Sequence, residues 1–271
     1  MKNQPRLIGV FDSGVGGLTV VKELLSTLPG TDIVYLGDTA RVPYGSKSPK
    51  TVERYALSCM RFLRSRGAEM ILVACNTASA NALPALQKEG DCPVIGAVNP
   101  GSMAAAKKTS SNQVAVIGTL STIESNAYSK EIKSINPSIQ VFGKACPLLV
   151  PLVEEGWLNH HVTLEIVKTY IGPLFKNNPK IDCLVLGCTH YPLLRDTIKK
   201  ALRELGVNEV SVVDSAETMA TATKKLSESS KTTSQGQLKI YVTDSTRIRS
   251  VGAQFLGQKL EHFELVDLQT T

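Results

Sequence analysis

Short apolar runs alternate along the chain with longer stretches in which apolar residues recur at helical spacing. Runs with the length of buried strands span residues 7–12, 32–38, 70–75, 93–98, 113–119, 139–145, 183–188, 210–215 and 239–244. Stretches such as 18–28 and 48–67 instead repeat apolar positions every three or four residues, as one face of an amphipathic helix does. This alternation predicts an α/β fold with mostly parallel sheets.

The apolar runs also repeat at a nearly constant offset, between 106 and 113 residues. The matching pairs are 8–11 (IGVF) with 114–117 (VAVI), 33–37 (IVYLG) with 139–143 (IQVFG), and Cys75 with Cys188. We interpret this as an internal duplication that gives two similar, pseudo-symmetric α/β lobes. The first lobe is expected to comprise residues 1–97 and 212–271, and the second residues 98–211. On composition alone, segment 225–237 (KLSESSKTTSQGQ) is a polar surface loop.

Two of the apolar runs end on a cysteine that small polar residues follow. The local sequences are Cys75-Asn76-Thr77 and Cys188-Thr189-His190. In open α/β sheets, ligands bind at the carboxyl ends of the strands, where loops lead into helices. We therefore expect the two thiols to oppose each other across an active-site cleft between the lobes.

Two opposed thiols suit the inversion of a stereocentre. One base removes a proton from carbon on one face, the conjugate acid on the other face returns a proton, and the roles swap in the reverse direction. A free thiol is only a few per cent ionised at neutral pH, so each needs a neighbour that accepts its proton or holds it as thiolate. Asp12, which ends the first strand, is placed to assist Cys75, and His190 is placed to assist Cys188.

Polar residues near the first two strand ends are candidates for substrate binding. Asp12 and Ser13 lie in GVFDSGVGGLTV, which matches neither the dinucleotide-binding fingerprint nor the phosphate loop. Its glycines can bring backbone amides close to a small anion at a helix start, although a structural turn would also tolerate them. Tyr44 and Gly45, on a proline-bounded loop, are suited to hydrogen-bonding a carboxylate.

The residues around the thiols complete this set. Asn76, Thr77 and Thr189 offer donors that suit the carboxylate and amine of an amino acid, although helix capping alone would explain either threonine. Glu154 lies in the second lobe's counterpart of the loop that holds Tyr44. It either orients His190, binds an ammonium group, or is a solvated acid at a helix start.

Composition and charge narrow the other functional classes. With 42% hydrophobic residues, no run near the roughly 20 that cross a bilayer, and no signal-peptide pattern, we expect a cytoplasmic protein without membrane contact. The net charge of +6 comes with only 5% aromatic residues and no basic run interleaved with them, so no nucleic-acid partner is expected. The six cysteines include no C-x-x-C pair, which favours reduced thiols and no metal site.

Together these motifs resemble those of the glutamate racemases, in the cofactor-independent aspartate/glutamate racemase superfamily. The segments concerned are GVFDSGVGGLTV, DTARVPYG, ACNTASA, VPLVEEG and GCTHYPLL, in family order from residue 9 to 194. The resemblance implies a two-lobed α/β fold that interconverts L- and D-glutamate without pyridoxal phosphate or metal and supplies D-glutamate for peptidoglycan. Family members are often dimers, so a homodimer is a further expectation.

Motif matching also implies roles for individual residues. It puts the catalytic cysteines at Cys75 and Cys188 and the auxiliary acid at Glu154. It puts the substrate contacts at Asp12, Ser13, Tyr44, Gly45, Asn76, Thr77, Thr189 and His190. The adjacent Glu155 leaves open which carboxylate acts, although the preceding VPLV favours Glu154.

Three other functions fit parts of this pattern. Racemization of aspartate is the nearest, because only the resemblance points to glutamate. An amino-acid-binding protein would also use two lobes around a cleft, but it would not need two thiols. A thiol hydrolase or transferase would use one nucleophilic cysteine together with His190.

Overall fold

The computed structural model describes residues 7–226 and 236–268, a part of the chain in which no helix is long and apolar enough to cross a membrane. Its strands are β1 (Leu7–Asp12), β2 (Asp32–Gly37), β3 (Met70–Val73), β4 (Val94–Gly96), β5 (Gln113–Gly118), β6 (Gln140–Ala145), β7 (Cys183–Gly187), β8 (Ser211–Asp214), β9 (Leu238–Val242) and β10 (Glu264–Leu265). Its α-helices are α1 (Leu18–Thr27), α2 (Pro49–Ser65), α3 (Asn76–Glu89), α4 (Val98–Lys108), α5 (Leu120–Glu124), α6 (Ala127–Ile135), α7 (Leu149–Glu154), α8 (His161–Asn177), α9 (Arg195–Glu204), α10 (Ser215–Leu226) and α11 (Thr246–Leu256).

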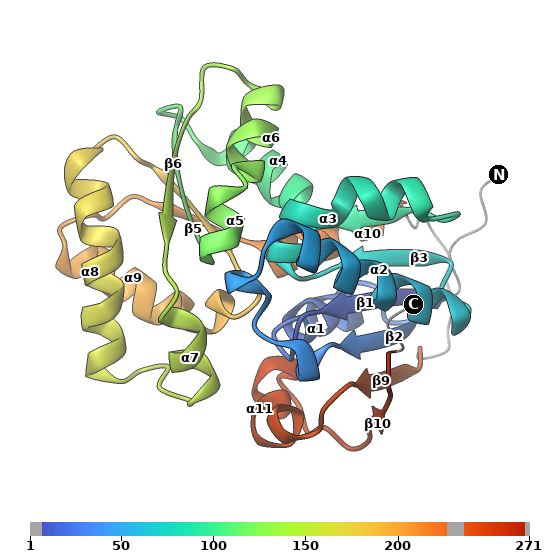
Figure 1. Ribbon diagram of the computed structural model, residues 1–271. Helices are drawn as coiled ribbons and strands as arrows, with labels where there is room; N and C mark the ends of the chain where they lie inside the picture. Colours follow the sequence, from blue (N-terminus) through green and yellow to red (C-terminus); the bar gives the residue numbers. More distant parts are fainter. Residues whose placement is uncertain (1–6, 227–235, 269–271) are drawn as a thin grey trace.

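The strands form two separate sheets, one in each half of the molecule (Figure 1). The first sheet has the order β10-β9-β2-β1-β3-β4, and the second has the order β6-β5-β7-β8. Every pairing between these strands is parallel. The predicted α/β class, with two lobes built on parallel sheets, is therefore confirmed.

Helices cover both faces of the first sheet because its central strands are apolar on both sides. Along β1, Ile8 and Val10 belong to the same buried cluster as Leu18 of α1, whereas Phe11 packs in the cluster that α2 and α3 complete. Strands buried on both faces are typical of parallel sheets, and full burial of each such side chain stabilises the fold by about 1.5–3 kcal/mol. Figure 1 shows the same layering, with α2 and α3 in front of the strands.

The internal duplication is visible in the strand order. The order β2-β1-β3-β4 of the first sheet recurs as β6-β5-β7-β8 in the second. The strand that precedes each cysteine also pairs at the same place, with Met70 opposite Ile8 in the first sheet and Cys183 opposite Val114 in the second. Met70 and Cys183 are 113 positions apart, as are Cys75 and Cys188. The two cysteines therefore follow equivalent strand ends.

The predicted match between β2 and β6 is wrong by two residues. Ile33 pairs with Ile8, but the residue that pairs with Val114 is Val141 rather than Ile139. A shift of two residues keeps every side chain on the same face of its strand. The apolar pattern therefore could not distinguish the two registers.

The tail of the chain is shared between the two sheets. Strand β8, most of which the sequence analysis assigned to the first lobe, pairs with β7 and is the counterpart of β4. The return to the first sheet comes with β9, which pairs with β2, and with β10 beside it. Between them, α10 packs against α1 and α4. The polar loop predicted at 225–237 lies largely outside the described residues.

Candidate active site

The carboxyl ends of the strands from both lobes surround one cavity of about 420 Å³. Among its lining residues are Ser13, Tyr44, Gly45, Cys75, Asn76 and Thr77 from the first lobe, and Thr119, Glu154, Cys188, Thr189 and His190 from the second. Of the residues predicted for the site, Asp12 alone does not line the cavity, because it is fully buried. The cavity therefore brings the two thiols to one compartment, with a size typical of small-molecule sites.

Cys75 lies at the junction of β3 and α3, where it is buried. Its thiol donates to Ser13 Oγ at 3.5 Å, and its Sγ accepts the Ala78 amide at 3.5 Å as the cap of α3. Burial, and after it the negative charge of Asp12, raises the pKa of the Cys75 thiol to about 12. Cys75 is therefore a protonated thiol at neutral pH when the cavity is empty.

Cys188 follows β7 and is the first member of a chain of three side chains. Its Sγ lies 3.9 Å from His190 Nδ1, and His190 Nε2 lies 3.1 Å from Glu154 Oε1 on α7. Burial would lower the pKa of the imidazole, but its hydrogen bonds to Cys188 and Glu154 outweigh this and raise the pKa to about 10. Together, His190 and Glu154 can accept a proton from the Cys188 side and return it.

The two adjacent glutamates have different surroundings. The Glu154 side chain is 19% exposed and reaches His190, whereas that of Glu155 is 61% exposed and lies 3.3 Å from Arg247 Nη1. Burial raises the pKa of Glu154, but the hydrogen bond and charge of His190 outweigh it, so the net shift is downward. Glu154, rather than Glu155, is therefore the carboxylate that contacts His190, the neighbour of Cys188.

Asp12 contacts the second lobe rather than Cys75. Its Oδ2 accepts the Gly14 amide at 3.0 Å, and its Oδ1 accepts the Thr189 hydroxyl at 3.4 Å. Burial raises the pKa of this carboxyl, although the charge of His190 opposes the shift. Within the described part of the chain, no hydrogen bond joins Asp12 to Cys75, and Ser13 is the side chain at the Cys75 sulfur. Asp12 acts on the Cys75 thiol through its charge, and the predicted assistance to Cys75 stays a prediction.

The glycine-rich turn after β1 brings the first lobe close to the second. A Cβ atom at Gly16 would lie 2.3 Å from Thr189 Oγ1 and 2.6 Å from His190 Nδ1. Real Cβ atoms essentially never approach other atoms so closely, so only glycine fits at this position. The group that approaches Gly16 is the His190 segment of the other lobe, and the predicted approach of backbone amides to a small anion stays a prediction.

Asn76 and Thr77 also reach across the lobes. Asn76 Oδ1 accepts the Tyr128 hydroxyl at 2.6 Å, and Thr77 Oγ1 lies 2.8 Å from Thr119 Oγ1 and 3.1 Å from Thr122 Oγ1. Hydroxyl groups can switch between donating and accepting, so this cluster can redirect a donor toward a bound carboxylate. Thr119 was not predicted, yet it stands 106 residues after Ser13, and the repeat therefore contained a signal for it.

The tyrosine hydroxyl of the loop after β2 is already bonded to a carboxylate of the same loop. The Tyr44 hydroxyl donates to Asp38 and is buried, while Arg41 pairs with the same carboxylate at 2.7 Å. These contacts occupy the hydroxyl and fix the loop. A contact of Tyr44 or Gly45 with a substrate carboxylate would therefore come from the main chain.

The remaining titratable groups do not add a metal site to this cavity. In the two described ranges, no group of three or more His, Cys, Asp or Glu side chains is placed to hold a metal ion. Cys59, Cys92, Cys146 and Cys183 are free thiols outside the cavity lining. Arg247 on α11, in contrast, lines the cavity and was not predicted, because it lies in the tail beyond the recognisable motifs.

Comparison with known proteins extends these observations to nearly the whole chain. A family model described as Asp/Glu/Hydantoin racemase matches residues 8–248. The glutamate racemase of Geobacter metallireducens is 48% identical over 269 residues, covering 97% of each chain. The crystal structure of glutamate racemase from Francisella tularensis in complex with D-glutamate superposes with a TM-score of 0.89 at 38% identity, covering 100% of both chains.

A more distant protein shares the fold alone. The aspartate racemase of Picrophilus torridus is 20% identical, with a TM-score of 0.57, and covers 82% of this chain and 94% of its own. The similarity to glutamate racemases is much higher and extends over the strand ends that carry both thiols. This chain therefore belongs to the Asp/Glu/Hydantoin racemase family, within which it groups with the glutamate racemases.

Proposed function

We propose that this glutamate racemase uses Cys75 and Cys188 as its two bases, one for each face of the α carbon. The observation that carries the proposal is the position of the two thiols, which follow equivalent strand ends and line the same cavity. In the family, this activity supplies D-glutamate for peptidoglycan. A cytoplasmic location and a homodimer stay predictions.

Each half of the reaction moves one proton. The thiolate of one cysteine takes the α proton, so the Cα–H bond breaks and an S–H bond forms, while the electron pair delocalises into the α-carboxylate. The thiol of the other cysteine then gives its proton to the opposite face of Cα and becomes a thiolate. One turnover therefore inverts the carbon and exchanges the protonation states of the two cysteines.

The two cysteines reach these states in different ways. His190 and Glu154 exchange a proton with Cys188 through the 3.9 Å and 3.1 Å contacts of their chain. Cys75 contacts only the Ser13 hydroxyl and the Ala78 amide among the hydrogen bonds described for its sulfur, and burial favours its neutral form. Cys75 is thus ready to act as the acid, and it acts as the base only once substrate has changed its surroundings.

Substrate binding is assigned to the polar groups around the thiols. Ser13, Asn76, Thr77 and Thr189 line the cavity and supply hydroxyl, amide and main-chain donors for the carboxylates. The main chain at Tyr44 and Gly45 is a further donor set. Asp12, held between Gly14 and Thr189, stays close enough to influence Cys75 and His190 through its charge.

Replacement of each cysteine by serine tests the two-base assignment. A serine hydroxyl is far too weak an acid to exchange the α proton, so Cys75→Ser and Cys188→Ser should each lower kcat by about 10²- to 10⁴-fold. Cys92→Ser is the matched control, because Cys92 is a partly exposed free thiol outside the cavity lining. Polarimetry with L-glutamate, without added cofactor, measures the rates, and L-aspartate serves as the alternative substrate. Wild-type rates in either catalytic variant would refute the assignment.

A further inference from the structure

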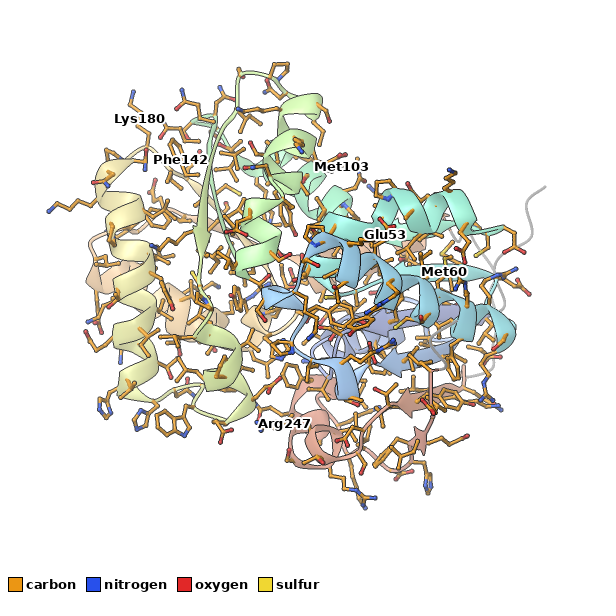
Figure 2. All side chains as sticks on the ribbon, in the orientation of Figure 1. Glu53, Met60, Met103, Phe142, Lys180 and Arg247 are labelled. Atoms are coloured by element: carbon orange, nitrogen blue, oxygen red, sulfur yellow. The ribbon has the colours of Figure 1, made fainter. Side chains whose placement is uncertain are left out.

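Helix α11 lies in the C-terminal part of the chain, which has no counterpart in the internal duplication. It contacts His190 and Glu154, the two side chains that follow Cys188 in the site. The Phe255 ring meets the His190 ring edge-on, with centroids 5.0 Å apart and an interplanar angle of 76°. At the other end of the helix, Arg247 Nε lies 3.6 Å from Glu154 Oε2. Figure 2 shows Arg247 reaching from α11 toward α7 of the second lobe. A helix packed with the first lobe thus touches both His190 and Glu154.

Both oxygens of Glu154 are occupied, and the two partners come from different lobes. Oε1 lies 3.1 Å from His190 Nε2, and Oε2 lies 3.6 Å from Arg247 Nε, while Nη1 of the same guanidinium pairs with Glu155 Oε1 at 3.3 Å. A carboxylate held at one oxygen can rotate about its terminal torsion, which has a broad energy well. The second contact restricts that rotation and keeps Oε1 on the imidazole.

We propose that Arg247 is a positioning residue of racemization, which holds the Glu154 carboxylate against His190 and so supports proton exchange at Cys188. The inference rests on the roles proposed above for Cys188, His190 and Glu154. Arg247 also joins the two lobes at the edge of the cavity. Its contact with Glu154 therefore depends on how the two lobes are placed relative to each other.

The charges around His190 give the sign of the expected effect. The imidazole faces Cys188 in its own turn, Asp12 from β1 and Glu154 from α7, while α11 presents the uncharged Phe255 ring and, beyond Glu154, Arg247. The Glu154 carboxylate is one of the groups that raise the pKa of His190. If Glu154 moves away after loss of Arg247, the pKa of His190 must fall. As the pH is raised, the variant should then lose racemization activity at a lower pH than the wild type does.

The expected size of the effect is modest because the Arg247 side chain is 45% exposed. A partly exposed ion pair changes the equilibrium between the paired and unpaired positions of its side chains by up to about fivefold. We therefore expect Arg247→Gln to lower kcat by roughly two- to fivefold, with a smaller change in KM, and to move the alkaline limb to lower pH. Arg247→Lys keeps the charge and should restore most of kcat.

The matched control is Arg249→Gln on the same helix. The Arg249 guanidinium lies over the Phe263 ring at 5.2 Å, and Arg249 does not line the cavity. Racemization of both enantiomers is measured over a range of pH for the wild type and the three variants, with circular dichroism to show that each is folded. The control should keep the kcat and pH profile of the wild type.

The outcomes separate this inference from the proposed function. If the wild type racemizes glutamate and Arg247→Gln matches it in kcat and pH profile, the positioning role is wrong while the two-base mechanism is untouched. An alkaline limb that moves to higher pH would also overturn it, since Arg247 would then act only through its own positive charge. If Cys75→Ser or Cys188→Ser racemizes glutamate at the wild-type rate, the two-base mechanism itself is wrong.

Discussion

At the scale of single residues, the two thiols occupy equivalent positions but different environments. Cys75 is buried beside a hydroxyl and near the negative Asp12, so its neutral form is favoured. Cys188 lies against an imidazole whose pKa is raised to about 10. A two-base racemase needs one thiol and one thiolate at the start of each turnover. The different surroundings of Cys75 and Cys188 fit this requirement of the proposed mechanism.

Glu154→Gln should shift the pH dependence of racemization. The neutral amide cannot stabilise the imidazolium, so the pKa of His190 falls from about 10 toward its ordinary value. His190 then loses its proton at lower pH, and the alkaline limb of kcat/KM should move down by roughly one pH unit or more. Glu165→Gln is the control, because the Glu165 side chain is exposed on α8 and pairs with Lys168 rather than with His190 or Arg247. Equal profiles for the two variants would contradict the role given to Glu154.

At the scale of elements, the turn between β1 and α1 sets how closely the two lobes meet. Gly16→Ala should push this turn away from Thr189 and His190, since the new methyl would lie within 2.3–2.6 Å of their atoms. Overpacking of this kind costs about 1–3 kcal/mol of stability. We expect a lower melting temperature and a lower kcat, because the His190 ring shifts.

Gly172→Ala in α8 provides the comparison for that substitution. Its added Cβ would make only an ordinary contact, at 3.5 Å from Leu205 Cδ2. Since alanine is the better helix former by about 1 kcal/mol, this variant should be at least as stable as the wild type and fully active. A Gly16→Ala variant that behaved like Gly172→Ala would show that the contact between β1–α1 and His190 is not tight.

Most elements could be predicted from the sequence because strands buried on both faces are short, apolar and separated by turns or helices. The prediction covered β1 to β9 but not β10, whose residues Glu264 and Leu265 are exposed and carry no apolar pattern. It matched β2 to β6 with an error of two residues, because a shift of two leaves the pattern of apolar faces unchanged. It also could not place β8, because membership of a sheet depends on long-range pairing.

Much of the site was also visible in the sequence, because parallel strands bring their carboxyl ends to one edge. The internal repeat identified Cys75 and Cys188, and the motifs after each strand identified most of the cavity lining. Asp12 was expected at Cys75 but contacts Thr189, because the direction of a buried side chain depends on the packing of both lobes. Arg247 gave no signal, since its partner Glu154 is brought near only by the fold.

At the scale of the whole molecule, the duplicated fold matches the symmetry of the reaction. The two enantiomers are equally stable in water, so kcat/KM must be the same in both directions even though the two thiols differ. Two similar lobes can serve mirror-image substrates because each contributes one thiol to the shared cavity. The contacts of Asp12, Thr77 and Asn76 with the second lobe hold the two lobes together around this cavity.

The isotope content of the first product tests this mechanism most directly. The enzyme is incubated with L-glutamate in D₂O, and the enantiomers are separated at low conversion and examined by proton NMR and mass spectrometry. With two bases, the returning thiol has exchanged with solvent, so newly formed D-glutamate carries deuterium at Cα while the remaining L-glutamate keeps its proton. The mirror-image result is expected from D-glutamate. Product that retains the original proton, or L-glutamate that gains deuterium as fast as D-glutamate forms, would show that one base serves both faces and would contradict the mechanism.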